Sequence, residues 1–158
     1  MDNSGNKPVV ALDSVPRKAF GIRLAFLLEK IVFNNGIVPP LFATSFDECA
    51  PENSINSKDT LAAFRVYTLN KFDATHDVDS DVSDYFRIKW YDTKYIALSE
   101  FVTNSDQSFY FNFPENKKEL DIFLLTSPES KGLYRFKIEV KFLDGRGFSE
   151  VTNPVRLY

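Results

Sequence analysis

The chain has 158 residues, of which 44% are hydrophobic and 26% are charged, and this composition is ordinary for one globular domain. Its formal net charge of −3 leaves no excess positive charge to displace counterions from a phosphate backbone, so a nucleic-acid partner is not expected. The longest apolar run, Leu24 to Phe33, is interrupted by charged residues and is much shorter than the roughly 20 residues of a membrane-spanning helix.

The beginning of the chain, Met1 to Lys7, is polar and made of small residues, and it lacks the apolar stretch of a signal peptide. We therefore expect residues 1–14 to form a flexible tether and residues 15–158 to form a single domain. Cys49 is the only cysteine, so no disulfide can form within the chain.

The first apolar segment alternates with the two-residue period of a strand, although helical spacing also fits part of it. The residues on one parity are Phe20, Ile22, Leu24, Phe26 and Leu28. The hairpin-turn sequence Asn34-Asn35-Gly36 that follows favours strands. Pro39-Pro40 then removes two ladder donors, so the returning segment 41–46 is expected at a sheet edge or after a bend.

Two polar segments, 47–60 and 70–84, predict long surface loops on either side of a strand at 64–68. Alternation predicts further strands at 86–90 and 109–113, and an apolar run at 122–125 is typical of a fully buried strand. Between 93 and 102 the apolar residues repeat every three to four positions after Thr93, a possible N-cap, which predicts one short helix.

The C-terminal part has the strongest pattern. Apolar and charged residues alternate without interruption from Tyr134 to Phe142, the turn sequence Asp144-Gly145-Arg146-Gly147 follows, and Phe148 to Leu157 returns. About eight strands with at most one short helix predict an all-β fold, an antiparallel two-sheet sandwich with an immunoglobulin-like topology.

An acidic loop is the strongest candidate for a metal site. Asp77, Asp79 and Asp81 alternate, and carboxylates spaced in this way can converge on calcium. The EF-hand pattern fails, because its glycine and glutamate positions hold Val82 and Ile88. We therefore favour a solvated, charge-rich connection without a cofactor, and a bound calcium ion is the alternative.

Other chemistry-bearing residues give weaker signals. His76, the only histidine, lies in the same polar loop without a nucleophile motif, so we expect it to be exposed to solvent. Trp90 shares its parity with buried strand residues and is expected in the core, whereas Tyr91 and Tyr110 lie on the opposite parity and are candidates for exposed binding contacts. Cys49 lies among carboxylates, which predicts an inert thiol.

Several segments together resemble a family of uncharacterised bacterial envelope lipoproteins, known as a domain of unknown function. The resemblance covers Val15 to Tyr158 and is carried by Ala19-Phe20-Gly21-Ile22-Arg23-Leu24, Asn70-Lys71-Phe72-Asp73, Asp81-Val82-Ser83-Asp84-Tyr85-Phe86, Tyr134 to Phe148 and Asn153-Pro154-Val155-Arg156-Leu157. It implies export, a lipid anchor on an N-terminal cysteine and display on the cell envelope or outer-membrane surface. The tether would then join the lipid to the fold.

These observations predict a non-enzymatic, envelope-displayed module that binds a protein or glycan partner at the cell surface. The long central loops are placed where β-sandwiches commonly recognise ligands, and edge strands could pair with a partner strand. Two alternatives remain: a structural subunit of a surface assembly, and a glycan hydrolase that uses paired carboxylates.

Overall fold

The computed structural model describes residues 1–2, 14–27, 54–57, 60–90, 94–104, 109–112 and 117–158. These residues form twelve strands, one α-helix and two short 3-10 helices, so the prediction of a mostly-β fold with one short helix is confirmed. The strands are β1 (Ser14–Val15), β2 (Gly21–Leu27), β3 (Ser54–Ser57), β4 (Leu61–Thr68), β5 (Phe86–Trp90), β6 (Lys94–Ala97), β7 (Phe109–Asn112), β8 (Lys117–Leu124), β9 (Gly132–Tyr134), β10 (Phe136–Phe142), β11 (Gly147–Val151) and β12 (Val155–Leu157). The helices are η1 (Arg17–Ala19), η3 (Ser83–Tyr85) and α1 (Leu98–Thr103).

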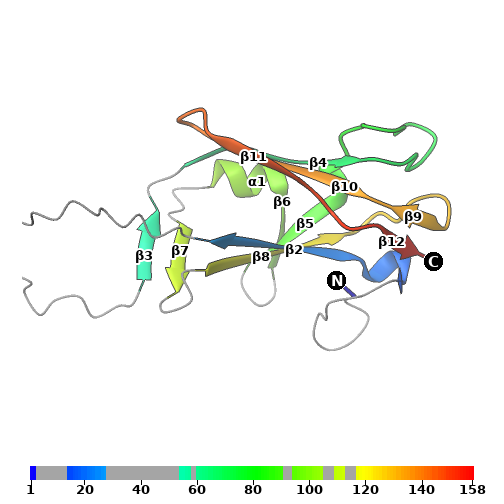
Figure 1. The fold of residues 1–158 in the computed structure, drawn as a ribbon, viewed down its shortest axis with the longest axis horizontal. Coiled ribbons are helices and arrows are strands. Elements are labelled where there is room, and N and C mark those ends of the chain that lie inside the picture. The colour runs from blue at the N-terminus through cyan, green and yellow to red at the C-terminus, as the bar shows by residue number, and fades with distance from the viewer. Residues whose placement is uncertain (3–13, 28–53, 58–59, 91–93, 105–108, 113–116) are drawn as a thin grey trace, which may run out of the picture.

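Two larger sheets form the body of the domain (Figure 1). The β4 sheet has the order β11-β10-β4, and the β8 sheet has the order β3-β7-β8-β5-β6 with β2 also paired to β8. All of these pairs are antiparallel. Helix α1 packs against β4 from one sheet and against β5 and β6 from the other.

A third, smaller sheet, β1-β12-β9, lies at the end of the molecule where the C-terminus is found (Figure 1). It arises because the C-terminal hairpin, expected as two continuous strands, is interrupted in both arms. At Arg135 the backbone turns to residues 69–70: its carbonyl accepts a hydrogen bond from Leu69 N, and its N–H donates to Asn70 Oδ1. In the return arm Pro154, which has no N–H, lies between β11 and β12. The described residues therefore form three sheets, where the sequence predicted two.

The core between the larger sheets is built from aromatic rings around Phe136, which is fully buried. Its ring centroid lies 5.4 Å from that of Phe20, which immediately precedes β2, and 5.5 Å from that of Phe86 on β5. Offset stacking and edge-to-face contacts of this kind add to the burial of apolar area. The alternating pattern of β10 is thus explained: Phe136, Ile138 and Val140 are buried.

The strand predicted from Phe20 to Leu28 is observed as β2, and the rival helical interpretation is wrong there. The helix expected over 93–102 is only partly present. Its first half is strand β6, which pairs with β5 from Arg87↔Ala97 to Trp90↔Lys94, and α1 begins at Leu98. Strand pairing overrode the helical spacing of these residues.

Some predictions fall outside the described residues: the turn at 34–36, the returning segment 41–46 and most of the tether. Of residues 1–14, Asp2 forms an isolated β-bridge with Phe20 and Ser14 belongs to β1. The loop predicted at 47–60 contains strand β3, which pairs with β7.

Candidate functional site

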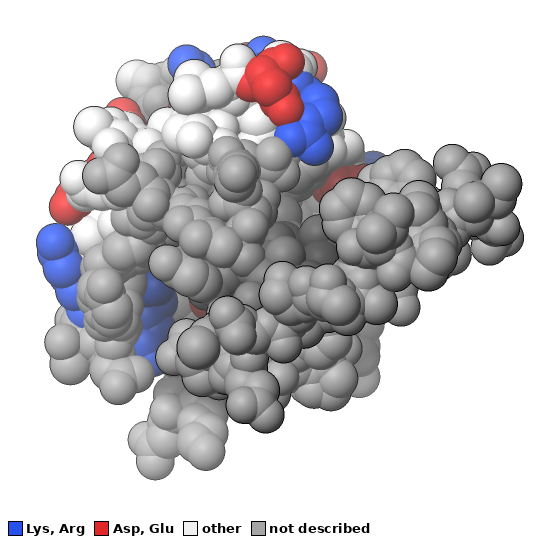
Figure 2. Space-filling model, turned by 90° about the vertical axis from the view of Figure 1, so that its left-hand side faces the viewer, with Lys and Arg blue, Asp and Glu red and all other residues white. Residues whose placement is uncertain are grey.

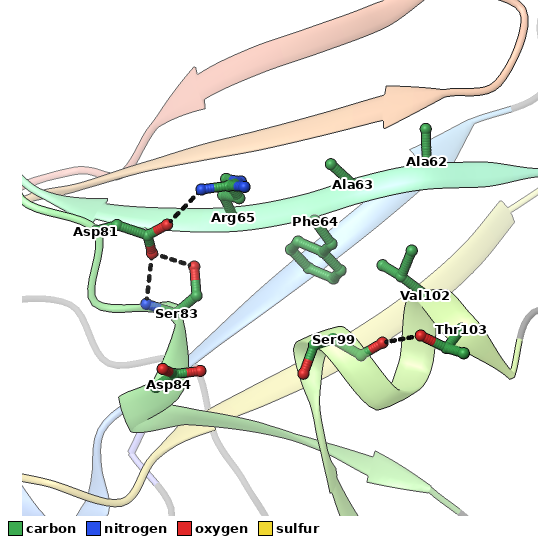
Figure 3. A pocket seen from close by; sticks show the side chains of 10 residues that line it. All are labelled: Ala62, Ala63, Phe64, Arg65, Asp81, Ser83, Asp84, Ser99, Val102 and Thr103. Atoms are coloured by element: carbon green, nitrogen blue, oxygen red, sulfur yellow. Dashed lines mark hydrogen bonds and ion pairs between the residues drawn. The ribbon is translucent and has the colours of Figure 1, made fainter.

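A pocket of about 360 Å³ opens between β4, the segment 81–84 and helix α1 (Figure 3). We call it the β4 pocket. Its walls include Ala62, Phe64 and Arg65 from the strand, Asp81 and Asp84 from the segment, and Ser99 from the helix. Three parts of the chain that are distant in sequence therefore meet at one hollow.

The segment 79–83 reaches this position because its backbone pairs with the outer edge of β4, the side away from β10. Val82 N donates to Val66 O and Thr68 N donates to Ser80 O, at 2.8 and 3.0 Å. The Ser83 hydroxyl accepts a hydrogen bond from Val66 N at 2.9 Å. Among the described residues, this is the last hydrogen bond between the segment and β4, because the chain turns away from the strand into η3 at Ser83. The β4 pocket lies next to this point.

An ion pair forms one wall of the β4 pocket. Arg65 Nη1 lies 2.9 Å from Asp81 Oδ2, and this hydrogen bond raises the pKa of the Arg65 guanidinium. The other Asp81 oxygen accepts hydrogen bonds from the N–H and the hydroxyl of Ser83. Because both Asp81 oxygens are engaged and the pair is exposed, the pair fixes the shape of the wall and adds little stability.

Two polar side chains are left for a ligand. In Figure 3 the Asp84 side chain lies on η3 and the Ser99 side chain lies at the start of α1, and both residues line the pocket. Neither group hydrogen-bonds to another side chain within the described part of the protein. The Thr103 hydroxyl, by contrast, donates to the Ser99 carbonyl at 3.0 Å and is already used. A ligand with hydrogen-bond donors would complement this part of the site.

A second polar cluster lies in the loop 70–80. Asp73 accepts hydrogen bonds from the backbone N–H groups of Thr75 and His76, both at 2.8 Å, from the Thr75 hydroxyl at 2.9 Å and from Tyr85 OH at 3.2 Å. Its carboxylate also lies 2.9 Å from Nδ1 of His76, which must carry a proton to donate here.

His76 is therefore half-buried, with 27% of its side chain exposed, and the expectation of a solvent-exposed histidine is wrong. Partial desolvation of the Asp73 carboxylate raises its pKa, but the hydrogen bonds from His76 and Thr75 outweigh this effect and hold the pKa well below its ordinary value of 3.8. Burial, and then the hydrogen bond to Asp73, raises the pKa of Tyr85. The cluster closes the loop over the buried Phe72, whose ring stacks on Tyr85 at 5.3 Å.

The three carboxylates predicted to bind calcium do not converge. Asp77 Oδ1 accepts a hydrogen bond from Val78 N, Asp79 has a left-handed backbone with φ 64°, and Asp81 pairs with Arg65. Within the described ranges no group of three or more His, Cys, Asp or Glu side chains is placed to hold a metal ion. Calcium binding by this loop thus remains a prediction from the sequence alone.

The aromatic candidates are only partly placed. Tyr91 and Cys49 lie outside the described residues. Tyr110 is on β7, opposite Asn56 of β3, and Trp90 is the last residue of β5; only the backbone of these two is described.

No pattern in the sequence predicts the β4 pocket. Arg65 and Asp81 are sixteen residues apart, and only the return of the loop 70–80 along β4 brings them together. The one signal available was the general expectation that an edge strand could pair with another strand.

The described surface carries both signs of charge. On the face drawn in Figure 2, basic and acidic side chains lie beside one another. No helix among the described residues combines the length and the apolar character needed to cross a membrane.

The fold and the pocket define a mostly-β domain with a concave site at a sheet edge. The family described as a domain of unknown function (DUF5034) matches residues 1–153, and the chain belongs to that family. No curated protein and no solved structure gives a significant match.

Proposed function

We propose that this chain is a non-enzymatic binding module displayed on the cell envelope, and that it recognises its partner at the β4 pocket. The observation that carries the proposal is the pair formed by Asp84 and Ser99, which line a hollow of about 360 Å³ and whose side chains form no hydrogen bond with another side chain among the described residues. A few converging polar groups in a concave site are typical of a recognition site.

The engagement of Asp81 supports binding over hydrolysis. A glycosidase needs two carboxyl groups that are free to act on the sugar, one as an acid and one as a nucleophile or base. Asp84 is free in this sense, but both oxygens of Asp81 are held by Arg65 and Ser83. Envelope display rests on the resemblance to envelope lipoproteins. An immunoglobulin-like topology is proposed from the number and alternating pattern of the strands.

The test is a paired screen of the whole chain against a glycan array and a phage-displayed library of linear peptides. We expect at least one class to bind, with binding lost in Asp84→Asn and kept in Asp144→Asn. Asp144 is a suitable control because it is exposed and bonds only locally, to Arg146. Failure of both classes to bind, or binding that is insensitive to Asp84→Asn, would overturn the proposal.

A structural subunit is the second candidate, because β11 forms an edge of the β4 sheet with every residue exposed. Light scattering coupled to size exclusion decides this point. A concentration-dependent oligomer that Ser149→Pro abolishes would favour the subunit, and a monomer at all concentrations would reject self-assembly.

A further inference from the structure

The backbone of β4 presents hydrogen-bonding groups alternately to its two sides, as in any strand. Val66 and Thr68 use their N–H and C=O groups on the outer side, toward 79–83. Phe64 precedes Val66 by two residues, so its N–H and C=O face the same outer side. Its side chain points into the core, where its ring lies 6.3 Å from that of Phe101.

Among the described residues, the outer edge of β4 is paired as far as Val66 and unpaired at Phe64. The partner segment leaves the strand at Ser83, and no described residue pairs with Phe64 on this side. Phe64 also lines the β4 pocket. The pocket thus contains one donor and one acceptor in the spacing of a strand ladder, next to a ladder that has already begun.

A donor and an acceptor arranged in this way are matched by the backbone of an extended peptide. Edge strands recruit such segments by continuing the ladder, with neighbouring side-chain pockets giving specificity.

The charges of the pocket identify the side chain that the peptide should carry. Among the described residues the Asp84 carboxylate has no hydrogen-bond or ion-pair partner, whereas Asp81 is neutralised by Arg65. A lysine or arginine on the peptide would form an ion pair with Asp84 and could also donate a hydrogen bond to the Ser99 hydroxyl oxygen. The negative net charge of the chain favours the approach of a basic segment.

We infer that the β4 pocket binds an extended peptide segment with a basic side chain, which adds to the outer edge of β4 at Phe64 and continues the ladder formed by 79–83. This inference rests on the proposed function and names the class of partner.

The test uses the whole chain and a peptide selected from a phage-displayed library of linear peptides. We expect the selected peptides to contain lysine or arginine, and N-methylation of one amide in the peptide to weaken binding about tenfold or more, because it removes a ladder hydrogen bond. Uniform tolerance of N-methylation along the peptide would overturn strand addition.

A matched pair of variants places the peptide on the protein. Ala62 and Ala74 are both exposed, but only Ala62 lines the pocket. Ala62→Trp should abolish binding and Ala74→Trp should leave it unchanged. An amide NMR titration of the unmodified chain gives a second readout that needs no variant: the Phe64 amide should show a large shift on adding peptide.

Three outcomes separate this inference from the proposed function. A selected peptide that shifts the NMR signal of the Phe64 amide supports both the inference and the proposed function. Binding of a glycan, if Asp84→Asn abolishes it, supports the proposed function but overturns peptide addition. Binding of neither class overturns both.

Discussion

The backbone N–H of Val66 donates a hydrogen bond to the Ser83 hydroxyl, 2.9 Å away, at the point where the segment 79–83 leaves the edge of β4. A side chain here takes the place of a backbone carbonyl and ends the ladder. Because the chain turns away at this residue, the next outward-facing position of the strand, Phe64, lies in an open pocket.

Replacing Ser83 by alanine should destabilise the protein. The substitution leaves the Val66 N–H without its acceptor and removes the hydroxyl that donates to Asp81. A loss of about 1–2 kcal/mol in the free energy of unfolding is expected from urea denaturation. Ser80→Ala is the control, since the Ser80 hydroxyl makes no hydrogen bond within the described residues; an equal loss in both variants would contradict the role given to Ser83.

Acid should weaken the loop 70–80 through Asp73. Its pKa is depressed in the folded protein, so the folded state favours the ionised form, and this contribution to stability is fully present above the ordinary pKa of 3.8. It is lost as the pH falls from that value toward the depressed one.

Thermal unfolding of wild type and Asp73→Asn across this pH range tests the assignment. The variant should be less stable near neutral pH, and the difference between the two proteins should shrink on acidification. Asp79→Asn is a control that suits the left-handed backbone at this position and should track wild type. A difference between wild type and Asp73→Asn that is constant with pH would show that the Asp73 charge is not responsible.

Phe136 should be among the most sensitive positions in the core. Its ring is fully buried between the two larger sheets, and Phe136→Ala should cost about 3–5 kcal/mol of unfolding free energy. Phe148→Ala, at a ring that is 37% exposed on β11, should cost clearly less. Chemical denaturation of both variants checks the ranking, and equal losses would argue against the described packing.

Two glycines should respond oppositely to alanine. A Cβ at Gly147 would lie 2.7 Å from the Val140 carbonyl oxygen, whereas the nearest atom to a Cβ at Gly132 is 3.8 Å away, on Tyr134. Gly147→Ala should therefore cost about 1–3 kcal/mol by forcing β11 away from β10. Gly132→Ala should be neutral or slightly stabilising. The melting temperatures of the two variants test this difference. A Gly147→Ala variant as stable as wild type would contradict the close approach of β10 and β11.

The sequence predicted the strands well where one face is buried and the other is exposed. The alternation in β10 and β2 is a direct record of that burial, and both strands are observed. It predicted less well where partners decide the outcome. Residues 94–97 have helical spacing but pair with β5, and Arg135 breaks the expected long strand because its backbone bonds to residues 69 and 70.

The candidate site was beyond the reach of periodicity. The alternation of Asp81 with Asp77 and Asp79 suggests only a weak candidate for a metal site, and it gives no sign of the ion pair with Arg65, which the return of the loop 70–80 brings close. The partial burial of His76 could not be predicted for a similar reason. Its contacts with Asp73 and Tyr85 depend on how the turn at 73–76 is placed against the Tyr85 ring, and no local sequence pattern determines that placement. Tertiary contacts, and not residue spacing, define both sites.

Amide hydrogen exchange at β4, followed residue by residue by NMR on the free protein, tests the open edge most directly. The Arg65 amide faces β10 and the Val66 amide is bonded to Ser83, so both should be protected from exchange. The Phe64 amide faces the pocket and has no described hydrogen-bond acceptor, so it should exchange at least about tenfold faster. Protection of Phe64 equal to that of Val66 would mean that the edge is already paired, and it would contradict the account of the β4 pocket as a site for an added strand.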